Sequence, residues 1–282
     1  MISEQDQAYK RDGVIVVPDV LNAETLAKVR SVIAELVAGA ATTLEHTDIY
    51  DLEPGHTAEN PRVRRIKTPH KVHALFDQIV RSTAVLDILK RLIGPDLRLH
   101  GSKLNMKSAQ YGSPVEWHQD WAFYPHTNDD VLAVGIAIDD MRVENGCLMV
   151  VPGSHRSPVR DHHQDGYFVG AVDPDGLTES AVPIELSAGD VSIHHARLLH
   201  GSAPNRSTRP RRFLLFEYAA ADAWPLVNFT DWAEFNSRLL CGVPVSSPRL
   251  TPVPVRIPLP AHPRQGSIYE VQSALARSAF NN

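Results

Sequence analysis

The feature of this sequence that most constrains its fold is a series of short β-rich runs at close spacing between residues 97 and 220. Examples are "LRLHGSKLNMK", "VLAVGIAI", "DVSIHHA" and "RRFLLFEYAA", and turn sequences such as "ENG", "PGS" and "SAGD" separate them. Short strands joined by tight turns are typical of antiparallel sandwiches and barrels. The sequence therefore predicts a mainly β core for this segment.

Two amphipathic helices precede that segment. Apolar residues recur at helical spacing after Asn22 and again after Ser82, and both are residue types that cap helix N-termini. Gly94 and Pro95 then end the second helix. The stretch 40–65 between the two helices is polar and looks irregular. Residues 1–96 are thus predicted to form flanking helices and one strand that pack outside the core.

The C-terminal residues 221–282 differ from both preceding segments. Seven prolines lie between Pro244 and Pro263, so this stretch cannot form a helix or a central strand. We expect an extended arm that lies over the barrel or over a neighbouring subunit, as in a homodimer joined by the arm. The whole chain, 1–282, is expected to be a single catalytic domain.

Composition narrows the class of partner. The formal net charge of −5 gives no positive field that would attract nucleic acid, and no apolar run approaches the roughly 20 residues of a membrane span. The N-terminus has no signal-peptide pattern, and two cysteines make no disulfide framework. We therefore expect a cytoplasmic protein that acts on a small molecule, without nucleic-acid or membrane partners.

The stretch "EWHQDW", residues 116–121, is the first sign of chemistry. Residues two apart in a strand share a face, so His118 and Asp120 can bind the same metal ion. A third ligand can come from "VSIHHARLLHGSAPN", residues 191–205, which offers His194, His195 and His200. Two histidines and one carboxylate suit non-haem iron(II), and zinc accepts the same ligand types.

Three motifs in the same order resemble the phytanoyl-CoA dioxygenase family: "EWHQDW", "ENGCLMVVPGSH" and "LLHGSAPNRSTRPRR". The resemblance spans about residues 5–220. It implies a double-stranded β-helix (jelly-roll, cupin-like) core and an enzyme that uses Fe(II), 2-oxoglutarate and O2. The implied reaction oxidises an unactivated C–H bond of a small metabolite, with hydroxylation as the expected outcome, and releases succinate and CO2.

The resemblance also assigns the metal ligands. It implies His118, Asp120 and His200 as the catalytic, iron-binding set, because His200 opens the family's His-Gly-Ser element. His194 and His195 are then expected to belong to a strand, one facing inward and one outward. His155 of "PGSH" is expected to be a structural residue at a turn.

A dicarboxylate cosubstrate requires a cation, because a buried carboxylate without a partner is costly. Arg211 lies eleven residues after His200, where the family places an arginine on this carboxylate, and Ser202 matches a hydroxyl on the same group. Arg209 and Arg212 are nearby alternatives. Alternation along a strand sends Arg211 and Arg212 to opposite faces, so only one of them can point inward.

Weaker parts of the resemblance extend the site. They imply cosubstrate contacts for Asn105 and for Lys71, although Lys71 fits a surface lysine equally well. The resemblance implies that Tyr124 faces the substrate. Further candidate substrate contacts are Trp121, for which the core is an alternative place, and Arg197 and Trp224 near the metal ligands. The polar loop 160–176 is a candidate lid.

Two other functions remain open from the residues alone. A zinc-dependent hydrolase or isomerase on a cupin-like barrel would use the same three ligands. A non-catalytic metal-binding barrel would also keep them. The zinc enzyme does not need Arg211 or Ser202, so these two residues favour the oxygenase over it. The intact set of His118, Asp120 and His200 argues against a vestigial metal site.

Overall fold

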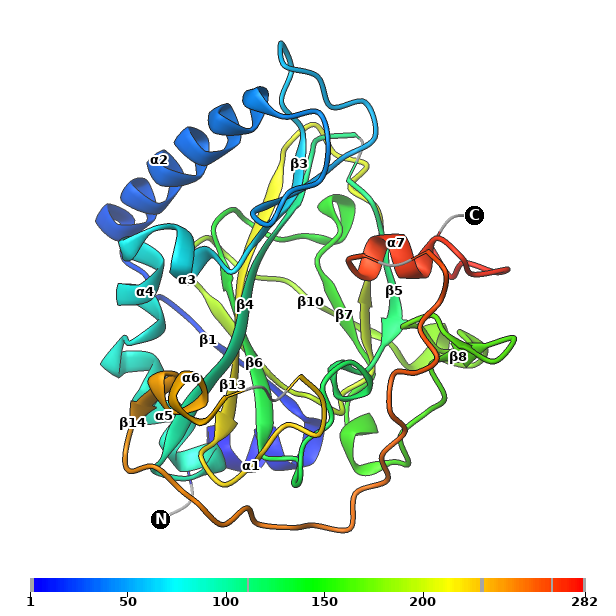
Figure 1. Ribbon diagram of the computed structural model, residues 1–282. Coiled ribbons are helices and arrows are strands. Elements are labelled where there is room, and N and C mark those ends of the chain that lie inside the picture. Colours follow the sequence, from blue (N-terminus) through cyan, green and yellow to red (C-terminus); the bar gives the residue numbers. More distant parts are fainter. Residues whose placement is uncertain (1–2, 111, 229–230, 265, 281–282) are drawn as a thin grey trace.

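The computed structural model describes residues 3–110, 112–228, 231–264 and 266–280, and two β-sheets form its core (Figure 1). The larger sheet has the strand order β1-β11-β6-β13-β4-β3-β2, with β14 beside β4. Its strands are β1 (Val14–Val17), β2 (Tyr50–Leu52), β3 (Val63–Lys67), β4 (Leu97–Lys107), β6 (Val131–Ala137), β11 (Val191–His195), β13 (Arg211–Ala220) and β14 (Leu239–Cys241). The smaller sheet has the order β10-β7-β12-β5, and its strands are β5 (Val115–His118), β7 (Leu148–Val150), β10 (Val182–Ile184) and β12 (His200–Ser202).

Neighbouring strands in both sheets run antiparallel, and the two sheets enclose a cavity between them. This arrangement is the jelly-roll with flanking helices that the sequence predicts. A separate hairpin of β8 (His163–Gln164) and β9 (Tyr167–Phe168) occupies the polar loop 160–176. That loop therefore has structure of its own, and Phe168 from it reaches the cavity.

The N-terminal segment contributes three strands to the larger sheet, more than its sequence pattern predicts. The stretch 40–65 was expected to be irregular, yet it contains β2 and the start of β3. In β3 the buried Ile66 alternates with Arg65 and Lys67, which face the cavity. Charged residues on the inner face hide the usual strand pattern, in which apolar residues face the core.

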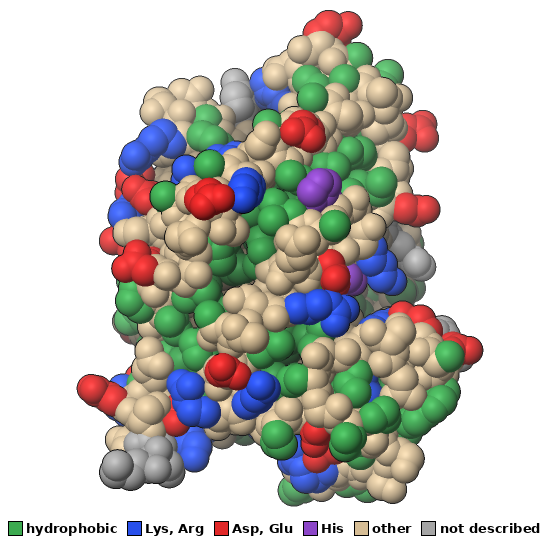
Figure 2. All heavy atoms as spheres, turned by 90° about the vertical axis from the view of Figure 1, so that its left-hand side faces the viewer, with side chains coloured by type: hydrophobic (Ala, Val, Ile, Leu, Met, Phe, Trp, Pro, Cys, Tyr) green, Lys and Arg blue, Asp and Glu red, His purple; other side chains and the backbone are tan. Residues whose placement is uncertain are grey.

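Helices cover the outer face of the larger sheet, as Figure 1 shows for α2, α4 and α5. The α-helices are α1 (Glu4–Asp12), α2 (Ala23–Gly39), α3 (Pro69–Val72), α4 (Ala74–Val80), α5 (Thr83–Ile93), α6 (Trp232–Ser237) and α7 (Ile268–Gln272). Asn22 caps α2 as predicted, because its Oδ1 accepts a hydrogen bond of 2.9 Å from the amide of Thr25. Ser82 lies at the cap position of α5, but its side chain makes no capping bond. On the face seen in Figure 2, side chains of both charges are interspersed.

Strand β13 lies between β4 and β6 and separates the two parts of the interior. One set of alternate side chains lines the cavity: Arg211, Phe213, Leu215 and Glu217. The other set packs in the main hydrophobic core with the helices: Leu214, Phe216 and Tyr218. The period of two residues along this strand thus places its functional side chains on one face.

The C-terminal arm folds back over the barrel of its own chain. Beyond α6 it runs along the lower edge of the view in Figure 1 and then up to α7, which contacts β5, and a short segment follows α7. Residues of the arm line the cavity, among them Pro258, His262 and Tyr269. Of the two arrangements predicted for the arm, the structure shows the one within a single chain.

None of the helices in the described part of the chain has the length and apolar character needed to cross a membrane.

Candidate metal centre and cosubstrate pocket

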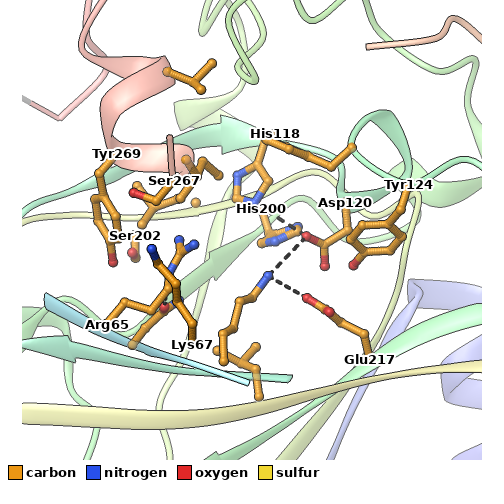
Figure 3. A pocket seen from close by; sticks show the side chains of 18 of the residues that line it. Arg65, Lys67, His118, Asp120, Tyr124, His200, Ser202, Glu217, Ser267 and Tyr269 are labelled. Carbon is orange, nitrogen blue, oxygen red and sulfur yellow. Dashed lines mark hydrogen bonds and ion pairs between the residues drawn. The ribbon is translucent and has the colours of Figure 1, made fainter. Parts of the chain in front are cut away.

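A cavity of about 530 Å³ lies between the two sheets (Figure 3). Its walls come from β3, β4 and β13 on one side, from β5, β7 and β12 on the other, and from the C-terminal arm. Volumes of this size are typical of small-molecule sites. A cosubstrate and a small substrate can therefore lie side by side within it.

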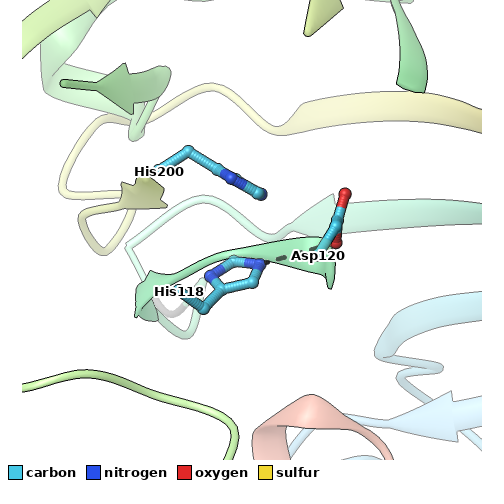
Figure 4. A group of neighbouring side chains, drawn as sticks. All are labelled: His118, Asp120 and His200. Carbon is cyan, nitrogen blue, oxygen red and sulfur yellow. Dashed lines mark ion pairs between the residues drawn. The ribbon is translucent and has the colours of Figure 1, made fainter. Parts of the chain in front are cut away.

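His118, Asp120 and His200 meet at the wall of this cavity formed by the smaller sheet. His118 ends β5, Asp120 begins a short 3-10 turn, and His200 begins β12 directly opposite His118 in the β5–β12 pairing. One ligand atom from each residue lies within 4.8 Å of the other two, and all three side chains are buried. Figure 4 shows the three side chains pointing toward one another.

The two imidazole rings are oriented by the backbone. Nδ1 of His118 lies 2.7 Å from the carbonyl oxygen of Glu116, and Nδ1 of His200 lies 2.9 Å from that of Leu198. Each Nδ1 must therefore carry the proton, which leaves the Nε2 lone pair for a metal ion. Burial lowers the pKa of His118 to about 4 and that of His200 well below its usual value, so both rings are neutral near pH 7.

Asp120 completes a set that fits a divalent cation. Burial alone would raise its pKa, but the charge of Lys103 and the neighbouring histidines hold the pKa well below its usual value. Its carboxylate oxygen lies 3.8 Å from Nε2 of His118, which is too far for a hydrogen bond. Two ligands at right angles, each about 2.1 Å from an ion, would be about 3 Å apart, so this gap can admit one.

The other candidate histidines have structural positions. His194 faces inward, and its Nε2 lies 3.7 Å from the second oxygen of Asp120, outside the group of three ligands. His195 faces the other way, and its ring stacks against that of His155 at a centroid distance of 5.2 Å. Nε2 of His155 lies 3.3 Å from the carbonyl oxygen of Lys10, a contact that joins this turn to α1.

Arg211 is a buried cation without an acidic partner in the described structure. Its side chain lines the cavity, Nη2 donates to the carbonyl of Gly146 at 2.9 Å, and Nε has no hydrogen-bond partner. Burial lowers its pKa to about 10, so the guanidinium stays charged near pH 7. A buried charge of this kind requires an anion, and a ligand carboxylate can supply one.

The two alternative arginines point elsewhere. Arg212 faces the opposite side of β13, as strand alternation predicts, and its guanidinium is 2.5 Å from Asp139. Arg209 is exposed and lies 3.8 Å from Glu144. Of the three arginines, only Arg211 lines the cavity.

Gly146 positions Arg211. Its φ of +75° is a left-handed conformation, and a Cβ at this residue would lie 2.3 Å from the carbonyl oxygen of Ala203. Glycine is therefore required here by both backbone conformation and space. The turn that it permits presents the carbonyl group that holds the guanidinium of Arg211.

Ser202 and Asn105 also line the cavity. Ser202 is buried two residues beyond His200 on β12. Nε of Arg65 donates to Oδ1 of Asn105 at 3.1 Å, which leaves the amide NH2 group of Asn105 as a donor. These donors give one end of the cavity a clear preference for an anionic ligand.

The opposite end of the cavity carries Tyr124 and Glu217 (Figure 3), and Lys103, which also lines the cavity, pairs with Glu217. Nζ of Lys103 is 2.7 Å from Glu217 and 3.8 Å from Asp120. Burial lowers the pKa of Lys103, but the two carboxylates outweigh this effect and raise it overall, so the ammonium stays charged. The hydroxyl of Tyr124 is buried and has no hydrogen-bond partner among the described residues.

Comparison with known proteins agrees with this geometry. A sequence model of the family described as "Phytanoyl-CoA dioxygenase (PhyH)" matches residues 9–213. The chain belongs to the phytanoyl-CoA dioxygenase family. It is 37% identical over 287 residues to a protein of Stutzerimonas stutzeri named "Probable alpha-ketoglutarate-dependent hypophosphite dioxygenase", covering 99% of this chain and 100% of that relative.

Proteins of lower sequence identity are similar to this chain over most of its length. The "Ectoine dioxygenase" of Nocardia farcinica is 27% identical over 236 residues, covering 76% of this chain and 77% of the relative. The crystal structure of EctD from S. alaskensis with bound Fe has a TM-score of 0.69 at 24% identity, covering 92% of this chain and 89% of that one. At this identity the structural likeness supports the fold alone.

Family membership and the ligand set decide the enzyme class. The chain is an Fe(II)- and 2-oxoglutarate-dependent dioxygenase, since alpha-ketoglutarate is another name for 2-oxoglutarate. A zinc hydrolase or isomerase would leave the buried charge of Arg211 unexplained. A non-catalytic barrel disagrees with relatives named as dioxygenases.

Four predicted contacts of this dioxygenase need correction, because none of these side chains lines the cavity: Lys71, Trp121, Arg197 and Trp224. Lys71 is exposed on α3. Trp121 is core, and its indole N–H donates to Pro254 at 3.2 Å.

The remaining two of these side chains are held elsewhere. Arg197 pairs with Asp129 at 2.8 Å, which uses its charge. Trp224 packs against the rings of Trp232 and Phe235.

The motif analysis missed several charged and polar residues of the pocket. These are Arg65, Lys67, Lys103, Glu217 and Tyr269. Period-two spacing could have found two of them, because Lys103 shares a face with Asn105 on β4 and Glu217 shares a face with Arg211 on β13. Tyr269 lies beyond residue 213, where the family match ends, so no motif pointed to it.

Proposed function

We propose that this dioxygenase hydroxylates a small, polar, charged molecule that binds beside Lys103, Glu217 and Tyr124. In this proposal His118, Asp120 and His200 hold Fe(II). Arg211, Ser202 and Asn105 bind 2-oxoglutarate at the other end of the cavity. The observation that carries the proposal is a buried set of three metal ligands in the same cavity as a buried arginine that has no acidic partner among the described residues.

When bound, Fe(II) and 2-oxoglutarate supply an oxidation in which one atom of O2 enters succinate, the other enters the substrate, and CO2 leaves. The residues of this chain orient the participants. Arg211 neutralises the carboxylate of 2-oxoglutarate that is remote from the metal. The backbone carbonyls of Glu116 and Leu198 keep both histidines in the tautomer that binds metal.

The charges at the substrate end support a polar substrate. Lys103 and Glu217 form an ion pair that lines the cavity, and the free hydroxyl of Tyr124 lies near them. Desolvating such groups against an apolar molecule would be costly, whereas a charged substrate can replace their lost contacts with water. Phe123 and Phe168 form an apolar part of the cavity wall next to His118, which limits the size of the substrate.

Hypophosphite is the first compound to test. The Stutzerimonas stutzeri relative named for it matches 99% of this chain, including the C-terminal arm that lines the cavity. Its oxidation would insert oxygen into a P–H bond, in place of the C–H bond expected from the family resemblance. Ectoine belongs in the same panel, because it is named in another relative.

The experiment measures substrate-stimulated succinate release from the Fe(II)-loaded enzyme with hypophosphite, ectoine and an apolar acid of similar size. We expect stimulation by a charged polar compound, and loss of stimulation in Tyr124→Phe, which leaves the charges around Asp120 in place, with the 2-oxoglutarate affinity unchanged. Stimulation by the apolar acid alone would contradict the proposed substrate class. The dioxygenase class itself is tested separately by the binding of 2-oxoglutarate.

A further inference from the structure

The C-terminal arm places a tyrosine at the end of the cavity that carries Arg211. Tyr269 lies in α7, is only 7% exposed, and lines the same cavity as Arg211 and Ser202. Figure 3 shows Tyr269 and Ser202 on one side of the metal ligands, and Tyr124 and Glu217 on the other. Tyr269 thus belongs to the cosubstrate end of the cavity.

The hydroxyl of Tyr269 is buried and has no hydrogen-bond partner among the described residues. Burial of such a group without a partner is costly, which calls for a ligand atom in the bound state. Burial raises the pKa of this phenol, while the charges of Arg65, Arg211 and Arg64 oppose the rise. The hydroxyl therefore stays protonated near pH 7 and can donate to an anion that these arginines attract.

Two arginines of β3 hold the Tyr269 ring in place. The guanidinium of Arg64 lies 4.4 Å from the ring centroid, and that of Arg65 lies 5.3 Å from it. Arg64 also forms an ion pair with Glu270, the next residue in α7. A ring fixed in this way presents its hydroxyl at a defined position, with little loss of entropy when a ligand binds.

Buried hydrogen bonds hold the arm itself against the barrel. Oε1 of Gln272 accepts from the amide of Glu116 at 2.9 Å, and its Nε2 donates to the carbonyl of Gly170 at 2.8 Å. The carboxylate of Glu116 in turn accepts from the amide of Ala279 at 2.7 Å. The arm is therefore fixed to β5, the strand that ends at His118.

We propose that Tyr269 is a cosubstrate-binding residue, whose hydroxyl donates a hydrogen bond to the metal-remote carboxylate of 2-oxoglutarate beside Arg211 and Ser202. The arm is then a functional wall of the active site. This inference rests on the 2-oxoglutarate dependence of the enzyme and adds a residue from outside the segment that matches the family.

The test is the dissociation constant of 2-oxoglutarate for the full-length Fe(II) enzyme without oxygen, measured by calorimetry. Tyr269→Phe keeps the ring and its contact with Arg64 but removes the hydroxyl. We expect the dissociation constant to rise about 10-fold or more, as for a lost hydrogen bond to a charged group. At saturating 2-oxoglutarate, kcat should stay within about twofold of wild type, because the hydroxyl binds the cosubstrate away from the reacting atoms.

Tyr9→Phe is the matched control. The Tyr9 hydroxyl is also buried without a partner, but Tyr9 does not line the cavity. We expect its affinity for 2-oxoglutarate to equal that of wild type. Unchanged affinity in Tyr269→Phe would overturn the proposal, and so would an equal loss in both variants. In either case, tight binding by wild type would leave the dioxygenase assignment intact.

Discussion

Individual side chains in this site are specialised by their neighbours rather than by residue type. The chain has 14 histidines, yet in its described part only His118 and His200 have their Nδ1 atoms held by backbone carbonyls and their Nε2 atoms beside Asp120. Arg211 and Arg212 are adjacent and chemically identical, but one lines the cavity and the other pairs with Asp139. Backbone geometry therefore decides which of several residues of the same type belongs to the site.

The arginine pair gives a residue-scale prediction. Arg211→Ala should raise the dissociation constant of 2-oxoglutarate by about 30-fold or more, because losing one partner of a buried charge pair costs about 2 kcal/mol or more. Arg212→Ala removes the same group from the outer face and should leave this affinity unchanged. Anaerobic calorimetry on both variants measures the difference. Equal affinities in the two variants would remove Arg211 from the cosubstrate site.

At the scale of residues, the sequence predicts the site residues that lie in recognisable motifs. It misses the residues that only the fold places at the cavity. His118, Asp120, His200 and Arg211 stand in recognisable motifs, and all four lie at the cavity. The prediction for Lys71 was wrong because the sequence of a basic stretch does not indicate which of its lysine side chains points toward the cavity. Lys67, four residues earlier, lines the cavity instead, because β3 turns it inward.

At the scale of elements, strand ends and turns carry the groups that form the site. Strand β13 begins with Arg211, and the turn at Gly146 supplies the carbonyl that holds its guanidinium. The hairpin β8–β9 and the arm meet through a hydrogen bond of 2.9 Å from the amide of Phe168 to the carbonyl of Pro260. The arm and the hairpin thus close the cavity together.

Gly146→Ala tests the turn. It places a Cβ 2.3 Å from a backbone carbonyl at a φ of +75°, so we expect destabilisation of about 1–3 kcal/mol and weaker 2-oxoglutarate binding. Gly166→Ala is the control, because φ is +84° there but no atom lies within 4 Å of the added Cβ. It should lose stability without losing cosubstrate affinity. Denaturant unfolding and calorimetry separate the two effects, and normal binding by Gly146→Ala would contradict the role of this turn.

A second element-scale prediction concerns the arm. Gln272→Ala leaves the amide of Glu116 and the carbonyl of Gly170 without their partners, which should cost about 2 kcal/mol of local stability. Amide exchange in α7 and trypsin cleavage after Arg264 should both become faster. The exposed Gln7 in α1 provides a control, Gln7→Ala, that should leave both rates unchanged. A variant that keeps wild-type protection would show that other contacts fix the arm.

Strands with apolar inner faces were predictable, and those with charged inner faces were not. The alternation in β13 is visible in "RRFLLFEYAA", whereas β3 reads as a basic stretch until its pairing with β4 is known. The proline content of the arm predicted its extended form. It carried no information on which surface the arm covers, because that choice depends on contacts such as Gln272 with β5.

The whole molecule is a jelly-roll in which the candidate active site lies between the two sheets. Its main hydrophobic core lies between the larger sheet and the helices, whereas His118 and His200 come from the smaller sheet and Asp120 from the turn after β5. The stability of the fold is therefore separated from the chemistry. The overall fold was predictable because the spacing of strands and turns survives in the sequence, even where single strands are hidden.

This separation predicts how the metal affects the molecule as a whole. A metal-free chain should fold, because its main core does not include the ligands. Fe(II) at 100 times its dissociation constant should add about 2.7 kcal/mol, which raises Tm by about 5 °C in a chain of this size. Thermal scans of the chelated and metal-loaded protein, kept free of oxygen, measure the shift. An unfolded metal-free chain would contradict the separation.

The central claim is that His118, Asp120 and His200 hold Fe(II) with coordination positions left for 2-oxoglutarate. The most direct test is visible absorption after adding Fe(II) and then 2-oxoglutarate without oxygen. We predict a metal-to-ligand charge-transfer band for wild type and none for Asp120→Ala. A colourless wild-type mixture, or an equal band in Asp120→Ala, would contradict the account.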